Sequence, residues 1–113
     1  MKKKEKVLEL FHNDLNCAQS VLYIYGEDLG IDGNTSKAVA CGFGGGIGRT
    51  QQICGAITGA IMVLGAKYFD GNNVAESKNN VYEKTKDLLN RFKEKNNSIN
   101  YYYLASFTNN SRS

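Results

Sequence analysis

The sequence predicts an all-α protein, a compact bundle of about five helices with a glycine-rich loop before a central helix. Apolar residues recur at three- and four-residue intervals through nearly the whole chain, as one face of a helix requires. We find no alternation of apolar and polar residues that would indicate strands. At 113 residues the chain suits one domain, residues 1–113, and its polar end is expected to fray from about residue 108.

The first half of the chain predicts three helices. Apolar spacing indicates the first helix over about residues 3–13. Asn16 is a good N-cap for the second helix, which should end near Gly26, or near Gly30 if it runs on. Asn34 or Thr35 can cap a short third helix that includes residues 38–41.

The second half predicts two longer helices, over about residues 50–68 and 74–94. The earlier one contains Gly55 and Gly59, and each glycine inside a helix costs about 1 kcal/mol relative to alanine. Close approach of another backbone is the usual reason to accept that cost, and Ala56 lies beside this pair. We therefore expect a central helix with a neighbour packed tightly against Gly55 and Gly59.

Composition and charge exclude several classes of protein. The formal charge of +3 comes largely from the first residues, MKKKEK, so binding to nucleic acid is not expected. Those lysines lead into an amphipathic segment and not a continuous apolar one, so no signal peptide is expected. The longest uncharged apolar run, residues 53–66, is shorter than the roughly 20 residues of a membrane span. Three irregularly spaced cysteines predict free thiols in the cytoplasm.

The glycine-rich stretch over residues 41–60 holds seven of the twelve glycines. Four interpretations of its loop compete, and a tight turn between packed helices ranks first because side chains would clash there. An anion-binding nest made by the loop backbone and a nearby cation ranks second. The others are close approach of backbone to a thiol or a cluster, and a flexible lid. The candidate binding residues are Gly44, Gly45, Gly46, Gly48 and Arg49.

Two of the three cysteines are candidates for redox chemistry. Cys17 lies in the first turn of the second helix, and Cys54 lies in or just after the first turn of the central helix, downstream of Arg49. Helix N-termini and nearby cations favour the reactive thiolate, so both cysteines have a physical route to a lowered pKa. Cys41 is expected to be an inert, buried thiol, although any single cysteine can simply be a small core residue.

Metal binding has less support than thiol chemistry. No Cys-x-x-Cys pair is present, and His12 is alone on a polar part of its helix, where we expect it at the surface. An iron–sulfur cluster would need a fourth ligand or a second chain, with Cys17 and Cys54 as the candidate ligands.

Three blocks of sequence, in this order and spacing, resemble the redox-active family called C_GCAxxG_C_C. They are NCAQSVL at 16–22, CGFGGGIGR at 41–49 and CGAITGAIMVLG at 54–65. The similarity covers roughly residues 5–95, and Phe43 to Gly46 match a segment of the family. By this resemblance Cys17 corresponds to the early cysteine of the family. The Cys-Gly-Ala-x-x-Gly box of the family corresponds to Cys54, Gly55, Ala56 and Gly59. The resemblance also implies association with electron-transfer proteins, and so the iron–sulfur cluster as a cofactor.

The chain departs from that family pattern in its cysteines. Members carry two late cysteines, but Tyr101 stands where the first is expected and no cysteine follows Cys54. Cys41, in contrast, has no counterpart in the pattern. If the chemistry of the family uses a late cysteine, this chain lacks it.

Three functional hypotheses follow from the sequence. The first is a cytoplasmic thiol-redox or electron-transfer protein that uses Cys54 and Cys17 and exchanges with a redox partner protein. The second is a small-anion-binding module built on the loop and Arg49. The third is a structural module that forms a homodimer, with the cysteines as core and the loop as a packing turn. Tyr101, Tyr102 and Tyr103 can form an interface in such a dimer or cap the core.

Overall fold

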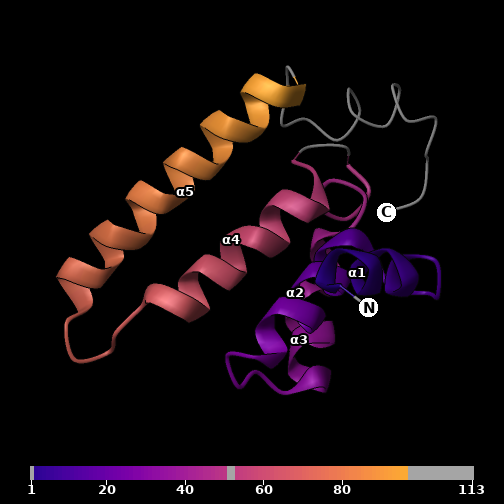
Figure 1. Cartoon of the computed structure of the whole chain (residues 1–113), viewed down its shortest axis with the longest axis horizontal. Helices are drawn as coiled ribbons and strands as arrows, with labels where there is room; N and C mark the ends of the chain where they lie inside the picture. The colour runs from indigo at the N-terminus through magenta and orange to yellow at the C-terminus, as the bar shows by residue number, and fades with distance from the viewer. Residues whose placement is uncertain (1, 51–52, 97–113) are drawn as a thin grey trace.

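The computed structural model describes residues 2–50 and 53–96, and the helices in these ranges form a bundle without β-strands, as the sequence predicts (Figure 1). The helices are α1 (Lys3–Phe11), α2 (Cys17–Glu27), α3 (Gly33–Ala40), α4 (Gly55–Tyr68) and α5 (Val74–Asn96). A single turn of 3-10 helix, η1 (Cys41–Phe43), follows α3 directly.

The start of α2 is fixed by the side chain of Asn16, as predicted. Its Oδ1 accepts a hydrogen bond from the backbone N–H of Gln19 at 2.8 Å, and the Asn16 N–H donates to Gln19 Oε1 at 2.9 Å. This reciprocal capping box satisfies two N–H groups that a helix start otherwise leaves unpaired. Gln19 also donates from Nε2 to the carbonyl of Lys37 at 2.9 Å, which ties α2 to α3.

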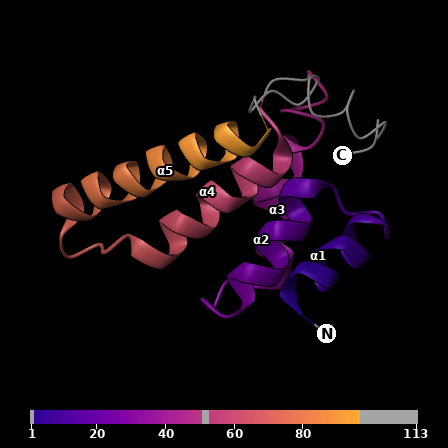
Figure 2. The same cartoon turned by 45° about the horizontal axis from the view of Figure 1, so that its top comes forward.

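The core lies where α2 meets α3 and α4. Ala18, Leu22 and Ala40 form its buried centre, and the partly buried Phe43 and Met62 pack around them. On the other side of α4, the long helix α5 runs antiparallel beside it, away from α1 and α3 (Figures 1 and 2). Helix α4 is therefore central, as predicted, with α2 on one side and α5 on the other.

Two predicted helix starts, those of α3 and α4, are wrong. Helix α3 is capped by Asp32, whose carboxylate accepts from Thr35 N–H at 3.1 Å, so neither Asn34 nor Thr35 is the cap. Helix α4 begins at Gly55 and not near Thr50. The Thr50 hydroxyl instead donates to the carbonyls of Gly46 and Ile47, and so belongs to the glycine loop.

Candidate functional site

The starts of α2 and α4 meet at Gly55. A Cβ on Gly55 would lie 3.1 Å from the backbone N of Ala18, 3.2 Å from Cys17 Cβ and 3.2 Å from the carbonyl oxygen of Phe43. Such distances are tighter than ordinary van der Waals contact, so these three segments pack here only because residue 55 has no side chain. Cys54 comes directly before Gly55, which brings Cys54 and Cys17 to the same junction.

The two cysteines at this junction are close enough to interact electrostatically. Both are free thiols, and both are only partly buried. The pKa of Cys17 is raised to about 11, first because burial disfavours its thiolate and second because the negative charge of Cys54 repels it. The expectation that the helix start lowers the pKa of Cys17 is therefore wrong, since burial and its neighbour outweigh the helix.

Cys54 is the N-cap residue of α4, one position before its first turn, whereas the sequence predicts it in or just after that turn. Its carbonyl accepts from the N–H groups of Ile57 at 3.0 Å and Thr58 at 3.2 Å, while its side chain makes no capping hydrogen bond. The sulfur thus caps no N–H group of α4, although it lies at the positive end of the helix. Such a position favours an anionic group.

Cys41 is exposed, so its predicted burial is wrong. Helix α3 ends at Ala40, which is fully buried, and the chain turns into η1 at the next residue. Cys41 keeps helical backbone angles, φ −54° and ψ −45°, so its side chain is rotated by about 100° from the buried face that Ala40 occupies. His12 is exposed, as predicted.

The glycine loop is a left-handed turn that packs on the start of α2. Five consecutive residues, Gly45 to Arg49, have φ between 58° and 72°. The left-handed region costs an L-residue roughly 1–2 kcal/mol, and here Ile47 and Arg49 adopt it along with three glycines. The loop is held by its own backbone, with Gly48 N–H donating to the carbonyl of Gly42 at 2.8 Å.

Gly44 gives the loop its contact with α2. A Cβ on Gly44 would lie 2.4 Å from Asn16 Nδ2 and 2.8 Å from Asn16 Cβ, so no side chain fits there. The same Nδ2 donates to the carbonyl of Cys41 at 3.0 Å. Asn16 therefore holds the loop as well as capping α2 beside Cys17. The Asn-x-x-Gln spacing predicts its capping role. Its hydrogen bond to the Cys41 carbonyl joins residues 25 positions apart, so no local sequence pattern predicts it.

Gly44, Gly45 and Gly46 are buried, whereas Gly48 and Arg49 are exposed. Arg49 makes no ion pair with any residue in the ranges 2–50 and 53–96. The predicted anion-binding role of the loop thus has one exposed cation in its favour and stays a prediction.

The rest of the glycine-alanine box serves helix packing. A Cβ on Gly59 would lie 2.9 Å from the carbonyl oxygen of Ala18, so α2 crosses α4 with backbone against backbone. The tight packing predicted for Gly55 and Gly59 is confirmed. Ala56 lies between them in sequence and lines an apolar cavity between α2, α4 and α5.

The donor atoms around the cysteines do not suit a cluster. Among the residues that the structure describes, no three His, Cys, Asp or Glu side chains are grouped as metal ligands. An iron–sulfur cluster is commonly held by four cysteine thiolates. Cys17 and Cys54 of one chain therefore do not fit the iron–sulfur cluster that the family resemblance implies. In the same described ranges, no helix is both long and apolar enough to cross a bilayer.

Comparison with known proteins places the chain in a family. Residues 15–111 match the model of the family described as "Putative redox-active protein (C_GCAxxG_C_C)". The chain is also 34% identical over 107 residues to a protein of Archaeoglobus fulgidus described as "Uncharacterized protein", covering 88% of this chain and 71% of that protein. No solved structure matches the chain.

Proposed function

The chain belongs to the C_GCAxxG_C_C family, and from this premise we propose that it is a thiol-redox protein in which Cys54 and Cys17 cycle between a dithiol and an internal disulfide. The observation that carries the proposal is the meeting of the starts of α2 and α4 at Gly55, which places Cys17 and Cys54 at one junction. Both thiols are partly exposed, so a partner can reach them.

The first step is attack by the Cys54 thiolate on a disulfide of a partner protein. A bond forms between Cys54 Sγ and one partner sulfur, and the partner disulfide breaks and releases its other sulfur as a thiolate, which takes a proton from water. Cys54 is assigned this step because it lies at the start of α4, where partial positive charge favours an anion. Cys17, with its pKa raised to about 11, is almost entirely protonated near pH 7 and does not attack first.

The second step closes the internal disulfide. Cys17 loses its proton and attacks Cys54 Sγ, the mixed disulfide breaks, and the partner leaves with two thiols and two more electrons. In the mixed disulfide Cys54 Sγ has no proton to lose, so repulsion from Cys54, one cause of the raised pKa of Cys17, is absent at this point.

The proposal also includes a redox partner protein and a cytoplasmic location. The partner is a protein with an accessible disulfide, or a dithiol when the cycle runs in reverse. A cytoplasmic location agrees with three cysteines that are all free. Anion binding by the glycine loop is not proposed, because only Arg49 favours it.

The test is peptide mapping after mild oxidation with oxidised glutathione, using Cys41→Ser protein as the background. We expect a Cys17–Cys54 disulfide in the folded monomer. In Cys17→Ser protein, glutathione should stay bound at Cys54, and in Cys54→Ser protein Cys17 should react far more slowly. A protein whose two thiols stay unlinked until it unfolds would contradict the proposal.

A further inference from the structure

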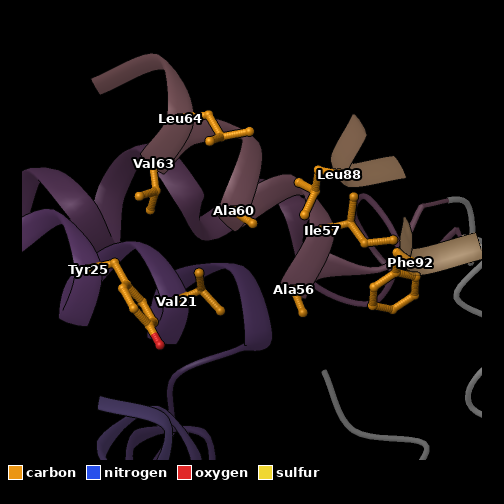
Figure 3. A pocket seen from close by; sticks show the side chains of 9 residues that line it. All are labelled: Val21, Tyr25, Ala56, Ile57, Ala60, Val63, Leu64, Leu88 and Phe92. Carbon is orange, nitrogen blue, oxygen red and sulfur yellow. The ribbon is translucent and has the colours of Figure 1, made fainter. Parts of the chain in front are cut away.

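An apolar cavity of about 410 Å³ lies open between three helices (Figure 3). Helix α4 forms its floor, α2 one side and α5 the other. Apart from the Tyr25 hydroxyl its lining side chains are apolar, among them Val21, Ile57, Val63, Leu64, Leu88 and Phe92. This set defines what we call the α2–α5 groove. Ordinary ligand sites combine such a lining with several polar groups that orient the ligand, and this one lacks them.

Helix α4 is covered less than its sequence requires. Its only charged residue is Lys67, and apolar residues occur all around its circumference, a pattern typical of a helix that is buried on every side. Yet burial is complete only at Gly55, Ile57, Thr58 and Gly59, and the residues from Ala60 to Leu64 are half-buried. The described helices thus leave part of the α4 surface without a partner.

We propose that the C-terminal segment 99–107 of the same chain packs in the α2–α5 groove. This segment, INYYYLASF, has no charged residue, and no charge occurs between Lys95 and Arg112. It carries six large apolar or aromatic side chains: Ile99, Tyr101, Tyr102, Tyr103, Leu104 and Phe107. Its composition therefore matches the lining of the groove.

Helix α5 ends close to the groove, so the segment that follows α5 begins near it. Helix α5 ends at Asn96, and Phe92, one turn earlier, is itself part of the lining. Because α4 and α5 are antiparallel, α5 ends beside the start of α4 (Figure 1). Ala56, in the first turn of α4, is part of the groove lining. An extended chain covers about 3.3–3.6 Å per residue, so the nine residues 99–107 can reach about 30 Å, more than twice the length of the two turns of α4 that form the floor of the groove.

Two further observations favour this segment over a second copy of the chain. The family match extends to residue 111, so the segment is part of the same family unit as the helices. It is also tethered a few residues from the groove, and a short tether gives an effective concentration in the millimolar range. A second copy has to bind without that advantage.

The packed segment would border the cysteine junction. Ala56 follows Cys54 by two residues, and Val21 follows Cys17 by one helical turn, and both line the groove. The packing itself is independent of the redox proposal and is tested without it.

The test is NMR on the intact chain with labelled methyl groups. We expect nuclear Overhauser effects from the ring protons of Tyr101–Tyr103 or Phe107 to the methyl groups of Val63, Leu64 and Leu88. The exposed Val39 on α3 is the control and should give none. A mixture of labelled and unlabelled chains distinguishes the segment of the same chain from that of a second copy. Nuclear Overhauser effects seen only between chains would overturn the proposal in favour of a dimer. Their absence altogether at the groove would also overturn it.

Limited proteolysis with chymotrypsin gives a second readout on the same chain. In the native protein, cleavage after Tyr101–Tyr103 should be slow, and Val63→Asp should speed it at least tenfold by expelling the segment. Val39→Asp is the matched control and should leave the rate unchanged. Leu104→Asp should act like Val63→Asp without altering the helices, which circular dichroism checks. Equal and rapid cleavage in all four proteins would overturn the proposal.

Discussion

Cys17 Cβ lies 3.2 Å from the position that a Cβ on Gly55 would occupy. Because Gly55 follows Cys54 directly, the missing side chain at residue 55 sets how near the two thiols come. The same contact explains why Cys54, the N-cap residue of α4, affects the pKa of Cys17, the first residue of α2. The glycine of the family box is thus as important to the cysteine pair as the cysteines themselves.

The first prediction concerns the ionisation of Cys17. Cys54→Ala removes a neighbouring charge and should lower the pKa of Cys17 below about 11, while burial, the larger cause, keeps that pKa above the ordinary value of a cysteine. Pulse alkylation from pH 7 to pH 12 with mass spectrometry measures this directly. Because the thiolate is the reactive form, the rate at Cys17 should rise with pH up to the pKa and rise earlier in the variant.

The control for this experiment is Cys41→Ala. Cys41 is exposed and does not contribute to the pKa of Cys17, so its removal should leave the alkylation profile unchanged. Identical shifts in both variants would show that the effect is not due to the Cys54 charge.

The second prediction concerns the crossing of α2 and α4. In Gly59→Ala the new Cβ would lie 2.9 Å from the backbone oxygen of Ala18, so the helices must move apart. We expect the free energy of unfolding to fall by about 1–3 kcal/mol, as overpacking typically costs. Gly65→Ala in the same helix meets no atom within 4 Å and should raise that free energy, by up to about 1 kcal/mol. Urea denaturation compares the two, and a loss of stability in Gly65→Ala would contradict the packing argument.

The sequence predicts the helices well because their apolar periodicity is local. It also predicts that Gly55 and Gly59 permit close packing, since glycine inside a helix needs such a reason. The pKa of Cys17, in contrast, depends on burial by residues far along the chain and on Cys54, 37 positions away, and no local pattern encodes either. The exposure of Cys41 follows from which face of α3 is buried, the face of Ser36 and Ala40, and the apolar pattern of this short helix does not single that face out.

The left-handed turn of the glycine loop was also beyond sequence reasoning. Glycines predict that positive φ values are available, but not that Ile47 and Arg49 adopt them as well. Those two residues are held by the hydrogen bonds of the loop and by Thr50, which the sequence placed in the next helix.

The third prediction isolates the cost of this backbone shape. Gly48 and Gly42 both have open space where a Cβ would stand, but only Gly48 has a positive φ, of 58°. Gly48→Ala should therefore lower the free energy of unfolding by about 1–2 kcal/mol. Gly42→Ala should leave it unchanged or raise it by up to about 1 kcal/mol, because alanine restricts the unfolded chain. Equal effects in thermal or urea denaturation would contradict a left-handed conformation at residue 48.

The fourth prediction separates the two roles of Asn16. Asn16→Ala loses both the cap to Gln19 and the bond to the Cys41 carbonyl, and should lower the free energy of unfolding by at least about 1 kcal/mol. Asn16→Asp keeps the capping oxygen and loses only the donor to Cys41. It should therefore retain most of the stability, because a negative charge is also favourable at the start of a helix.

Urea denaturation of the two Asn16 variants decides which role matters more. If Asn16→Asp is as unstable as Asn16→Ala, the bond that holds the glycine loop is worth more than the cap of α2. In that case the alkylation rate at Cys41 should also change in Asn16→Asp, because its own carbonyl has lost the bond that fixes η1. An unchanged rate with full stability would instead show that capping alone positions the start of α2, and with it Cys17.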